Sequence, residues 1–149
     1  MIIQFIFSIL SVIGFTIIFN VRGKIAFWSA LGGGIGWIIY LFTKKIGFSL
    51  GVSFFLAGSW ITFVSQLIAI YFKTPVTSAL IPTLTPLVPG GGAYYTMFYL
   101  LNENYDLALK KGTETIVVCG AIILGFLTVS EIFRLYLLRK KRIEKIKKQ

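Results

Sequence analysis

Long apolar stretches, separated by short polar breaks, make up most of this chain. A transmembrane α-helix needs about 20 predominantly apolar residues, with a range of roughly 17 to 25. Five stretches fit this length, and they lie at about residues 1–19, 25–43, 48–72, 76–101 and 113–138. The pattern predicts an all-α integral membrane protein with five transmembrane helices.

The fourth stretch cannot form one regular helix. Pro82, Pro86 and Pro89 each lack a backbone N–H, and three consecutive glycines follow the last of them. We expect the helix to break after Pro86 and to restart at about Ala93. Non-helical backbone inside a bilayer must be lined by protein or water, and a helix N-terminus attracts anions. The break therefore predicts an anion-binding cavity; a Pro-kinked packing helix, with glycines for close approach, is the alternative.

Hydroxyl side chains flank this break on both sides. They are Thr83, Thr85, Tyr94, Tyr95 and Thr96. A few polar groups in an otherwise apolar pocket can orient a small ligand. We therefore take Thr96 as a candidate substrate-binding residue.

Small residues recur at a spacing of four in three places. The pairs are Gly32 with Gly36, Gly47 with Gly51, and Ala121 with Gly125. Such pairs let two membrane helices approach closely. They predict a tightly packed bundle and a possible homo-oligomer, rather than a ligand site.

Composition and charge support the membrane prediction and give an orientation. Hydrophobic residues make up 56% of the chain, which is more than in most water-soluble domains. The net charge is nevertheless +10, and eight of the 15 Lys and Arg lie within residues 134–149. The positive-inside rule places this end in the cytoplasm. The N-terminus, which has no charged side chain before Arg22, is expected outside.

These charges divide the chain into a transmembrane helical bundle at residues 1–138 and a basic cytoplasmic tail at residues 139–149. We expect the tail to fix the topology on the inner leaflet of the lipid bilayer, with no nucleic acid bound. An anionic-lipid or nucleic-acid patch is the alternative. In an alternative topology, the fourth stretch enters the membrane and returns on the same side. The distribution of Lys and Arg barely separates this topology from five crossings, but the uncharged N-terminus favours five.

The residue types present argue against an enzyme. The chain has no His, which removes the commonest general base, and no GxSxG or P-loop motif. Its single Cys119 lies in an apolar run, so we expect a buried packing residue. We predict no catalytic residue, no metal site and no cofactor.

Two carboxylates lie within or beside the fifth stretch. Glu131 is three residues from Arg134, so an ion pair on one helix face is the plain interpretation, and a proton-coupling carboxylate is the alternative. Glu114 is expected to be a first-turn charge of the same helix.

Three segments resemble the threonine/serine exporter family. They are GlyPheThrIleIlePheAsn at 14–20, AlaLeuGlyGlyGlyIleGly at 30–36, and ProLeuValProGlyGlyGlyAlaTyrTyrThrMet at 86–97. The resemblance covers nearly all of the chain apart from the tail. It corresponds to the short C-terminal membrane module of that family, which also occurs as a separate small subunit. The chain departs from the family at Trp37, where some members have a His and an Arg.

The resemblance implies a bacterial inner-membrane exporter of small carboxylates, either threonine and serine or succinate-like dicarboxylates. It also implies a larger membrane subunit as partner. By motif match, Asn20, Pro86, Pro89, Gly90 and Tyr94 are implied as substrate-binding residues that line the cavity. A pore-forming or holin-like membrane protein is the runner-up, and a self-sufficient homo-oligomeric exporter is a third possibility.

Overall fold

The computed structural model describes residues 1–146, with side chains as far as Arg139. Every regular element in this range is helical. The elements are α1 (Ile2–Ile18), α2 (Lys24–Ile46), α3 (Leu50–Phe72), α4 (Val76–Leu84), the short 3₁₀ helix η1 (Thr85–Leu87), α5 (Gly90–Leu101) and α6 (Tyr105–Ile146). The all-α class is therefore confirmed for the described residues.

Three of these helices are long and apolar enough to cross a bilayer: α2, α3 and the part of α6 that ends at Arg139. The helix α1 and the α4–η1 segment are apolar but shorter. At 1.5 Å per residue, the 17 residues of α1 extend about 25 Å, against a hydrocarbon core of about 30 Å. The membrane class of the fold is confirmed, while the count of five crossings remains a prediction.

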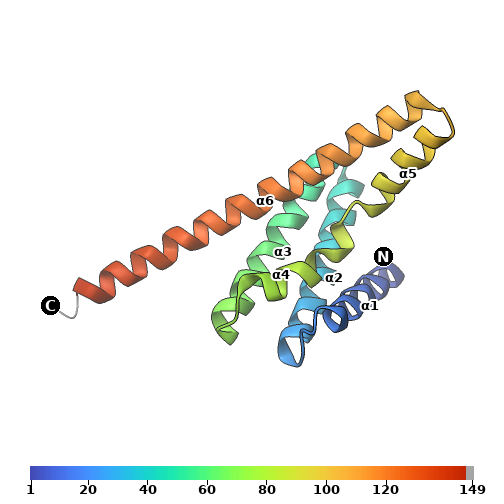
Figure 1. Cartoon of the computed structure of the whole chain (residues 1–149). Helices are drawn as coiled ribbons and strands as arrows, with labels where there is room; N and C mark the ends of the chain where they lie inside the picture. Colours follow the sequence, from blue (N-terminus) through green and yellow to red (C-terminus); the bar gives the residue numbers. More distant parts are fainter. Residues whose placement is uncertain (147–149) are drawn as a thin grey trace.

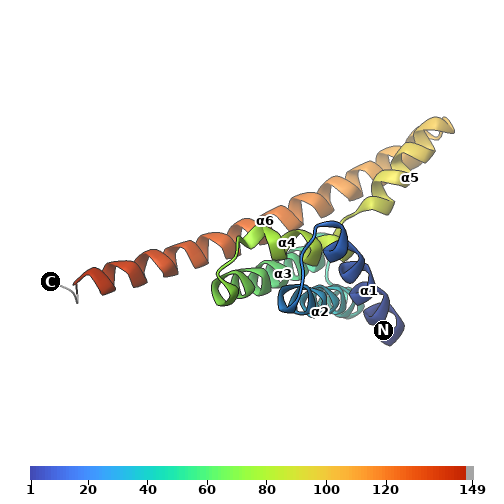
Figure 2. The ribbon, with the colours of Figure 1, turned by 60° about the horizontal axis from the view of Figure 1, so that its bottom comes forward.

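The helices α2 and α3 form the centre of the bundle. Helix α1 packs on α2, α6 lies across α3, and α4 contacts both α2 and α3 (Figure 1). Helix α5 contacts α6, and this pair extends away from the other helices (Figure 2). The broken segment thus runs from the interior of the bundle out to its periphery.

Caps and left-handed residues separate the elements. Gly47 ends α2 with φ of 102°, which favours glycine, and Ser49 accepts a hydrogen bond from the Val52 N–H at the start of α3. Asn104 accepts one from the Leu107 N–H at the start of α6. These signals are readable in the sequence, and α2 and α3 end close to the predicted limits.

The core forms where α2, α3, η1 and α6 meet. Tyr40 of α2 stacks on Phe54 of α3, with ring centroids 4.4 Å apart, and Trp37 lies 5.0 Å from Tyr40. Leu87 of η1 is 1% exposed in the same cluster, beside Val118 of α6. The break in the fourth stretch is therefore anchored in the core by an apolar side chain.

The first predicted glycine pair brings α2 and α3 together. Gly32 and Gly36 are both buried, and a Cβ added at either would lie 2.8 Å from a side chain of α3, Val64 or Ile61. The prediction that this motif serves helix packing is confirmed.

The other two predicted pairs have different outcomes. A Cβ at Gly125 would lie 2.7 Å from the carbonyl oxygen of Phe55, so α6 approaches the α3 backbone at this glycine. Gly47 and Gly51 do not form a motif, because Gly47 ends α2 and Gly51 belongs to α3. That prediction was wrong because the left-handed turn at Gly47 separates the two glycines.

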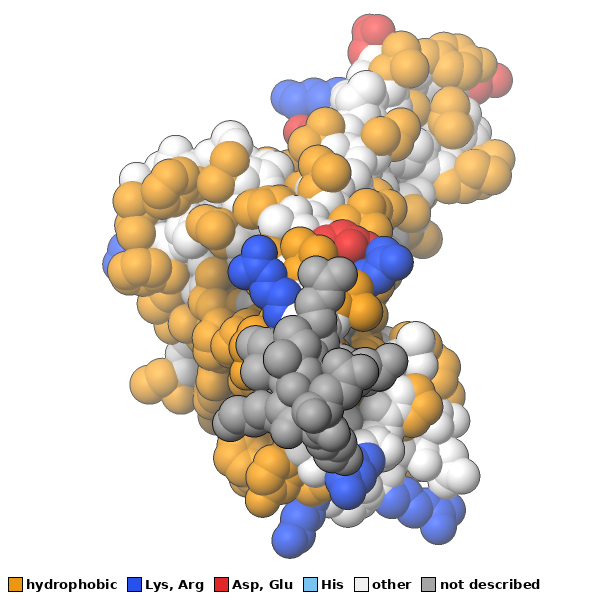
Figure 3. All heavy atoms as spheres, turned by 90° about the vertical axis from the view of Figure 1, so that its left-hand side faces the viewer, with side chains coloured by type: hydrophobic (Ala, Val, Ile, Leu, Met, Phe, Trp, Pro, Cys, Tyr) orange, Lys and Arg blue, Asp and Glu red, His pale blue; other side chains and the backbone are white. Residues whose placement is uncertain are grey.

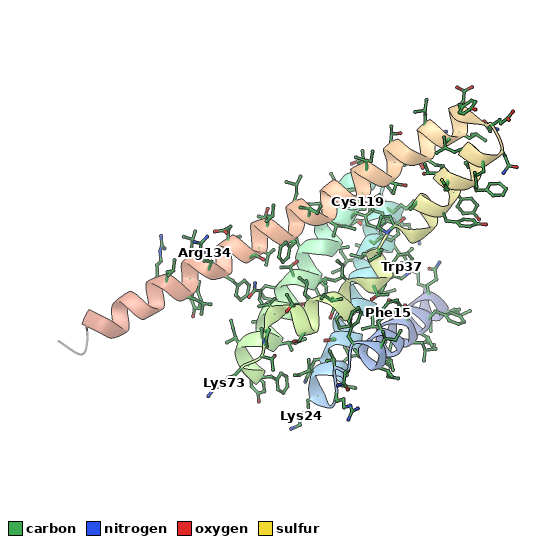
Figure 4. All side chains as sticks on the ribbon, in the orientation of Figure 1. Phe15, Lys24, Trp37, Lys73, Cys119 and Arg134 are labelled. Carbon is green, nitrogen blue, oxygen red and sulfur yellow. The ribbon has the colours of Figure 1, made fainter. Side chains whose placement is uncertain are left out.

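Helix α6 differs from the prediction in its start and in one side chain. It begins at Tyr105 rather than near residue 113, because the polar residues 105–111 form helical turns packed against α5, where Ala108 is 2% exposed. Cys119 was expected to be buried and is exposed on α6 (Figure 4). The helix is apolar on several faces at that point, so the sequence could not show which face packs.

Hydrophobic side chains cover much of the surface, as expected for a protein surrounded by lipid. In Figure 3 they spread over the flanks of the molecule, and Lys and Arg side chains lie at its lower edge, in the middle of the visible face and on the upper arm. Figure 4 places Lys24 and Lys73 at that same lower end of the bundle. Lys44 and Lys45 lie in the last turn of α2, at the other end of that helix from Lys24.

Gly33→Ala should destabilise the bundle. An added Cβ would lie 2.8 Å from the carbonyl oxygen of Thr83 and 2.7 Å from Val12, so α1 and α4 would both have to move. Overpacking of this kind costs about 1–3 kcal/mol. We expect a lower melting temperature in detergent. The matched control is Gly120→Ala, where the added Cβ meets nothing within 4 Å; an equal loss in the two variants would contradict the prediction.

Candidate functional site

The break in the fourth stretch follows directly from its prolines. Pro86 has no N–H for the Pro82 carbonyl, and the Thr85 N–H bonds to that carbonyl instead, which tightens the chain into η1. Val88 then adopts an extended conformation, and Pro89 precedes the first residue of α5. The predicted discontinuity is confirmed.

Helix α5 starts at Gly90, three residues earlier than the predicted Ala93. The Ala93 N–H already donates to the Pro89 carbonyl at 3.1 Å, so the three glycines form the first helical turn. Glycine lowers helix stability in water, but in an apolar environment an unpaired backbone costs more than the lost entropy. The prediction of the start was wrong for this reason.

The first turn of α5 leaves backbone donors available. The Gly90 N–H bonds to the Val88 carbonyl at 2.8 Å, while the N–H groups of Gly91 and Gly92 have no backbone acceptor among the described residues. Such donors and the helix dipole together form a local anion-binding end.

A cavity of about 230 Å³ lies beside this turn. Its lining comes from α2, α3, the break, the first turn of α5 and α6: Trp37, Leu50, Phe54, Pro86, Leu87, Val88, Pro89, Gly92, Lys111, Glu114, Thr115 and Val118. It combines apolar walls with one cation, one carboxylate and one hydroxyl. This is the arrangement of a small-ligand pocket, in which few polar groups fix the orientation.

Lys111 and Glu114 form an ion pair on the α6 wall of this cavity. The Lys111 Nζ donates to Glu114 Oε2 at 2.7 Å, and the two side chains are 41% and 39% exposed. Both residues were missed as site residues, because Lys111 precedes the fifth predicted stretch and Glu114 was interpreted as a first-turn charge. Their i,i+3 spacing was the available signal, but it carries meaning only once α6 is known to begin at Tyr105.

A second cavity, of about 270 Å³, lies on the other side of the break, toward α1. Its lining consists of Gln4, Phe7, Ser8, Ser11, Trp37 and Pro86. Trp37 and Pro86 line both cavities, so these two side chains lie between the α1 side and the α6 side. Figure 4 shows Trp37 near the centre of the bundle, beside the broken segment.

The predicted site residues do not all meet. Pro86 and Pro89 line the cavity, and Gly90 begins the helix next to it. Tyr94 is 63% exposed and stacks on Phe98 along α5, with ring centroids 6.3 Å apart.

Thr96 and Asn20 are placed outside the cavity lining. The Thr96 hydroxyl donates to the Gly92 carbonyl at 2.7 Å. Asn20 is exposed in the turn between α1 and α2, with φ of 55°, and this turn lies far from α5 in Figure 1. Its left-handed conformation fits a place in the turn, because Asn adopts positive φ more readily than most residues.

Glu131, further along α6, forms the ion pair that its spacing from Arg134 predicted. Arg134 donates to Glu131 at 3.3 Å, and both side chains are largely exposed. The predicted i,i+3 pair is confirmed.

A larger cavity of about 910 Å³ lies between α2 and α3, away from the break. Hydrophobic side chains dominate its lining, which includes Trp28, Trp60 and Tyr71, and Lys24 is the one charged residue among them. It lacks the converging polar groups of the smaller cavity.

The fold and this site define a helical integral membrane protein with a discontinuous helix beside a small polar cavity. Residues 4–132 match the model of the family described as "Threonine/Serine exporter, ThrE", and the chain belongs to this family. The family consists of membrane exporters and is not a class of enzymes. Searches of curated proteins and of solved structures found no match.

Gly92→Ala should force α5 away from α6. An added Cβ would collide with the Thr115 hydroxyl and lie 3.4 Å from the Thr115 Cβ. We expect a loss of about 1–3 kcal/mol in unfolding free energy, measured by thermal unfolding in detergent. The double variant Gly92→Ala with Thr115→Ala should recover most of it, because the colliding oxygen is gone.

The control for this pair is Gly91→Ala, whose added Cβ meets nothing within 4 Å. It should leave stability unchanged or raise it slightly, since alanine favours the helix. A double variant as unstable as Gly92→Ala alone would show that the contact with Thr115 is not the cause.

Proposed function

We propose that this chain is the small subunit of a two-component exporter of small carboxylates, threonine and serine or succinate-like dicarboxylates. The observation that carries the proposal is the cavity at the broken helix, which is lined by the Lys111–Glu114 pair and by Gly92, whose N–H has no backbone acceptor. The substrate carboxylate binds there, at the start of α5. Pro86, Pro89 and Gly90 shape this end of the pocket.

The binding mode follows from the physics of the break. The N–H groups of Gly91 and Gly92 have no backbone acceptor, and the α5 dipole adds a partial positive charge at the same point. Discontinuous helices in transporters present such ends to the carboxylates of their substrates. Lys111 adds an ammonium donor from α6, with its charge paired to that of Glu114. No metal or cofactor is needed for a carboxylate to bind in this way.

A larger membrane subunit is the proposed partner. Helix α5 has no buried residue in the described chain, and its first turn carries free polar groups beside the exposed Tyr94. Polar backbone within a bilayer must face protein or a water-filled cavity. A second membrane chain covering α5 would enclose these groups. Tyr94 and Thr96 then belong to the substrate path on α5, while Asn20 belongs to it only if the partner reaches the α1–α2 turn.

The proposed topology has five crossings in the bacterial inner membrane, with the N-terminus outside and the C-terminus in the cytoplasm. The common end of Lys24 and Lys73 supports it, since Figure 4 shows both at the lower end of the bundle. Residues 1–138 then form the transmembrane bundle and residues 139–149 the cytoplasmic tail. If this chain and the larger subunit each cross the membrane an odd number of times, the two would form the inverted repeats found in many transporters.

Export is tested by expressing the chain with the larger subunit and measuring efflux of threonine, serine and succinate. Gly90→Leu should reduce efflux about tenfold or more, because its side chain covers the donors of α5 without a clash at the Cβ. Pro89→Ala should also reduce it, since an alanine permits continuous helix across the break.

The control is Gly120→Leu on α6, at another glycine whose added Cβ meets nothing within 4 Å. It should export at the wild-type rate at equal membrane levels. Wild-type efflux from cells that produce Gly90→Leu would contradict binding at the start of α5. Lysis without export in cells producing the wild-type chain would instead favour a holin-like pore.

Topology is tested with reporter fusions. A reporter placed after Leu101 should be active outside the cytoplasm, and one placed after Lys73 should be active inside. These sides follow from five crossings and a cytoplasmic tail. A cytoplasmic signal after Leu101 would mean that the fourth stretch enters the membrane and returns on the same side.

A further inference from the structure

The cavity at the break carries a balanced pair of charges. Lys111 and Glu114 both line it and are in contact at 2.7 Å, yet each side chain keeps about two-fifths of its surface exposed. Ionisable groups along a membrane helix are costly unless they are paired or serve a function. This pair meets the first condition, and it faces a cavity large enough for a small molecule.

The charges around the pair are unequal. Lys44 of α2 and Lys110 of α6 act electrostatically on Glu114 but do not line the cavity, and Lys44 also donates to the Tyr40 hydroxyl at 3.4 Å. Glu114 thus lies near three lysines, and it is the one carboxylate in the cavity wall. A ligand with a cationic group has a single ionic acceptor there.

We propose that Lys111 and Glu114 select a zwitterionic α-amino acid over a dicarboxylate at this site, a step that rests on the exporter function proposed above. The ammonium group of the ligand binds the Glu114 carboxylate. Its carboxylate binds Lys111 and the free N–H group of Gly92, which line the same cavity. The ligand separates the two side chains of the pair and replaces each of their contacts with one of its own.

Geometry and charge both favour this class of ligand. An α-amino acid carries its two charges on one carbon, so they can reach two side chains that are themselves in contact. A dicarboxylate would bring its second carboxylate against Glu114, and like charges placed together disfavour a partner. A ligand with a carboxylate alone leaves Glu114 without an ionic contact but does not oppose it.

The test measures binding to the full-length chain in lipid nanodiscs by calorimetry. Three ligands are compared: threonine, 3-hydroxybutyrate, which lacks the ammonium group, and succinate. The wild-type chain should bind threonine most tightly. Glu114→Gln should weaken threonine binding about tenfold or more and leave 3-hydroxybutyrate almost unchanged, because only the ammonium contact is lost. Lys111→Gln should weaken both.

Glu131→Gln is the matched control, since Glu131 and Arg134 form the same i,i+3 pair far from the cavity. It should bind all three ligands as the wild type does. Equal threonine binding by Glu114→Gln and Glu131→Gln would overturn the proposal. So would an equal loss of threonine and 3-hydroxybutyrate in Glu114→Gln, which a merely structural pair would produce.

The exporter function and this selectivity fail in different ways. Binding and export of succinate without threonine would overturn the selectivity and leave the exporter function standing. Absence of binding and of efflux for every carboxylate, with the larger subunit present, would overturn both. Thermal unfolding of Glu114→Gln alongside Glu131→Gln verifies that both variants are folded.

Discussion

The need to pair every backbone polar group inside a bilayer governs this structure. Within hydrocarbon, an unpaired N–H or C=O costs several kcal/mol, so a chain interrupted by prolines can lie there only among other protein segments. Between α4 and α5 the chain meets this requirement with the tight hydrogen bonds of η1 and with Leu87, which is 1% exposed. The discontinuity is stable because the surrounding helices replace the lipid.

The glycines of α2 allow the neighbouring helices to enclose the break. Gly33 brings α2 within contact of the Thr83 carbonyl, one residue before α4 ends, and Gly36 allows Ile61 of α3 to close the other side. The side chains that could have filled this space are absent, so the backbone of the broken segment approaches α2 directly. The glycine run and the proline run, far apart in the chain, are therefore two parts of one packing arrangement.

The sequence predicted the parts of the fold that depend on residue type and missed those that depend on neighbours. Prolines define the break wherever they lie, so the discontinuity was predictable. The helical start at Gly90 was not predictable, because glycine disfavours helix in water, whereas an apolar environment has no water to compete for its backbone groups. Lys111 and Glu114 were missed because their shared face exists only in a helix that begins at Tyr105, which packing on α5 determines.

The two cavities flanking the break show where this bundle can change shape at least cost. Trp37 and Pro86 line both, with hydroxyl and amide groups on the α1 side and the ion pair on the α6 side. Val88 is extended and Pro89 has no N–H, so a displacement at these two residues breaks little helix. Rigid helices with a pliable joint between them give hinge motion, in which large changes concentrate in a few residues. A ligand that binds the start of α5 acts on that joint directly, because its contacts are made by the residues that would move.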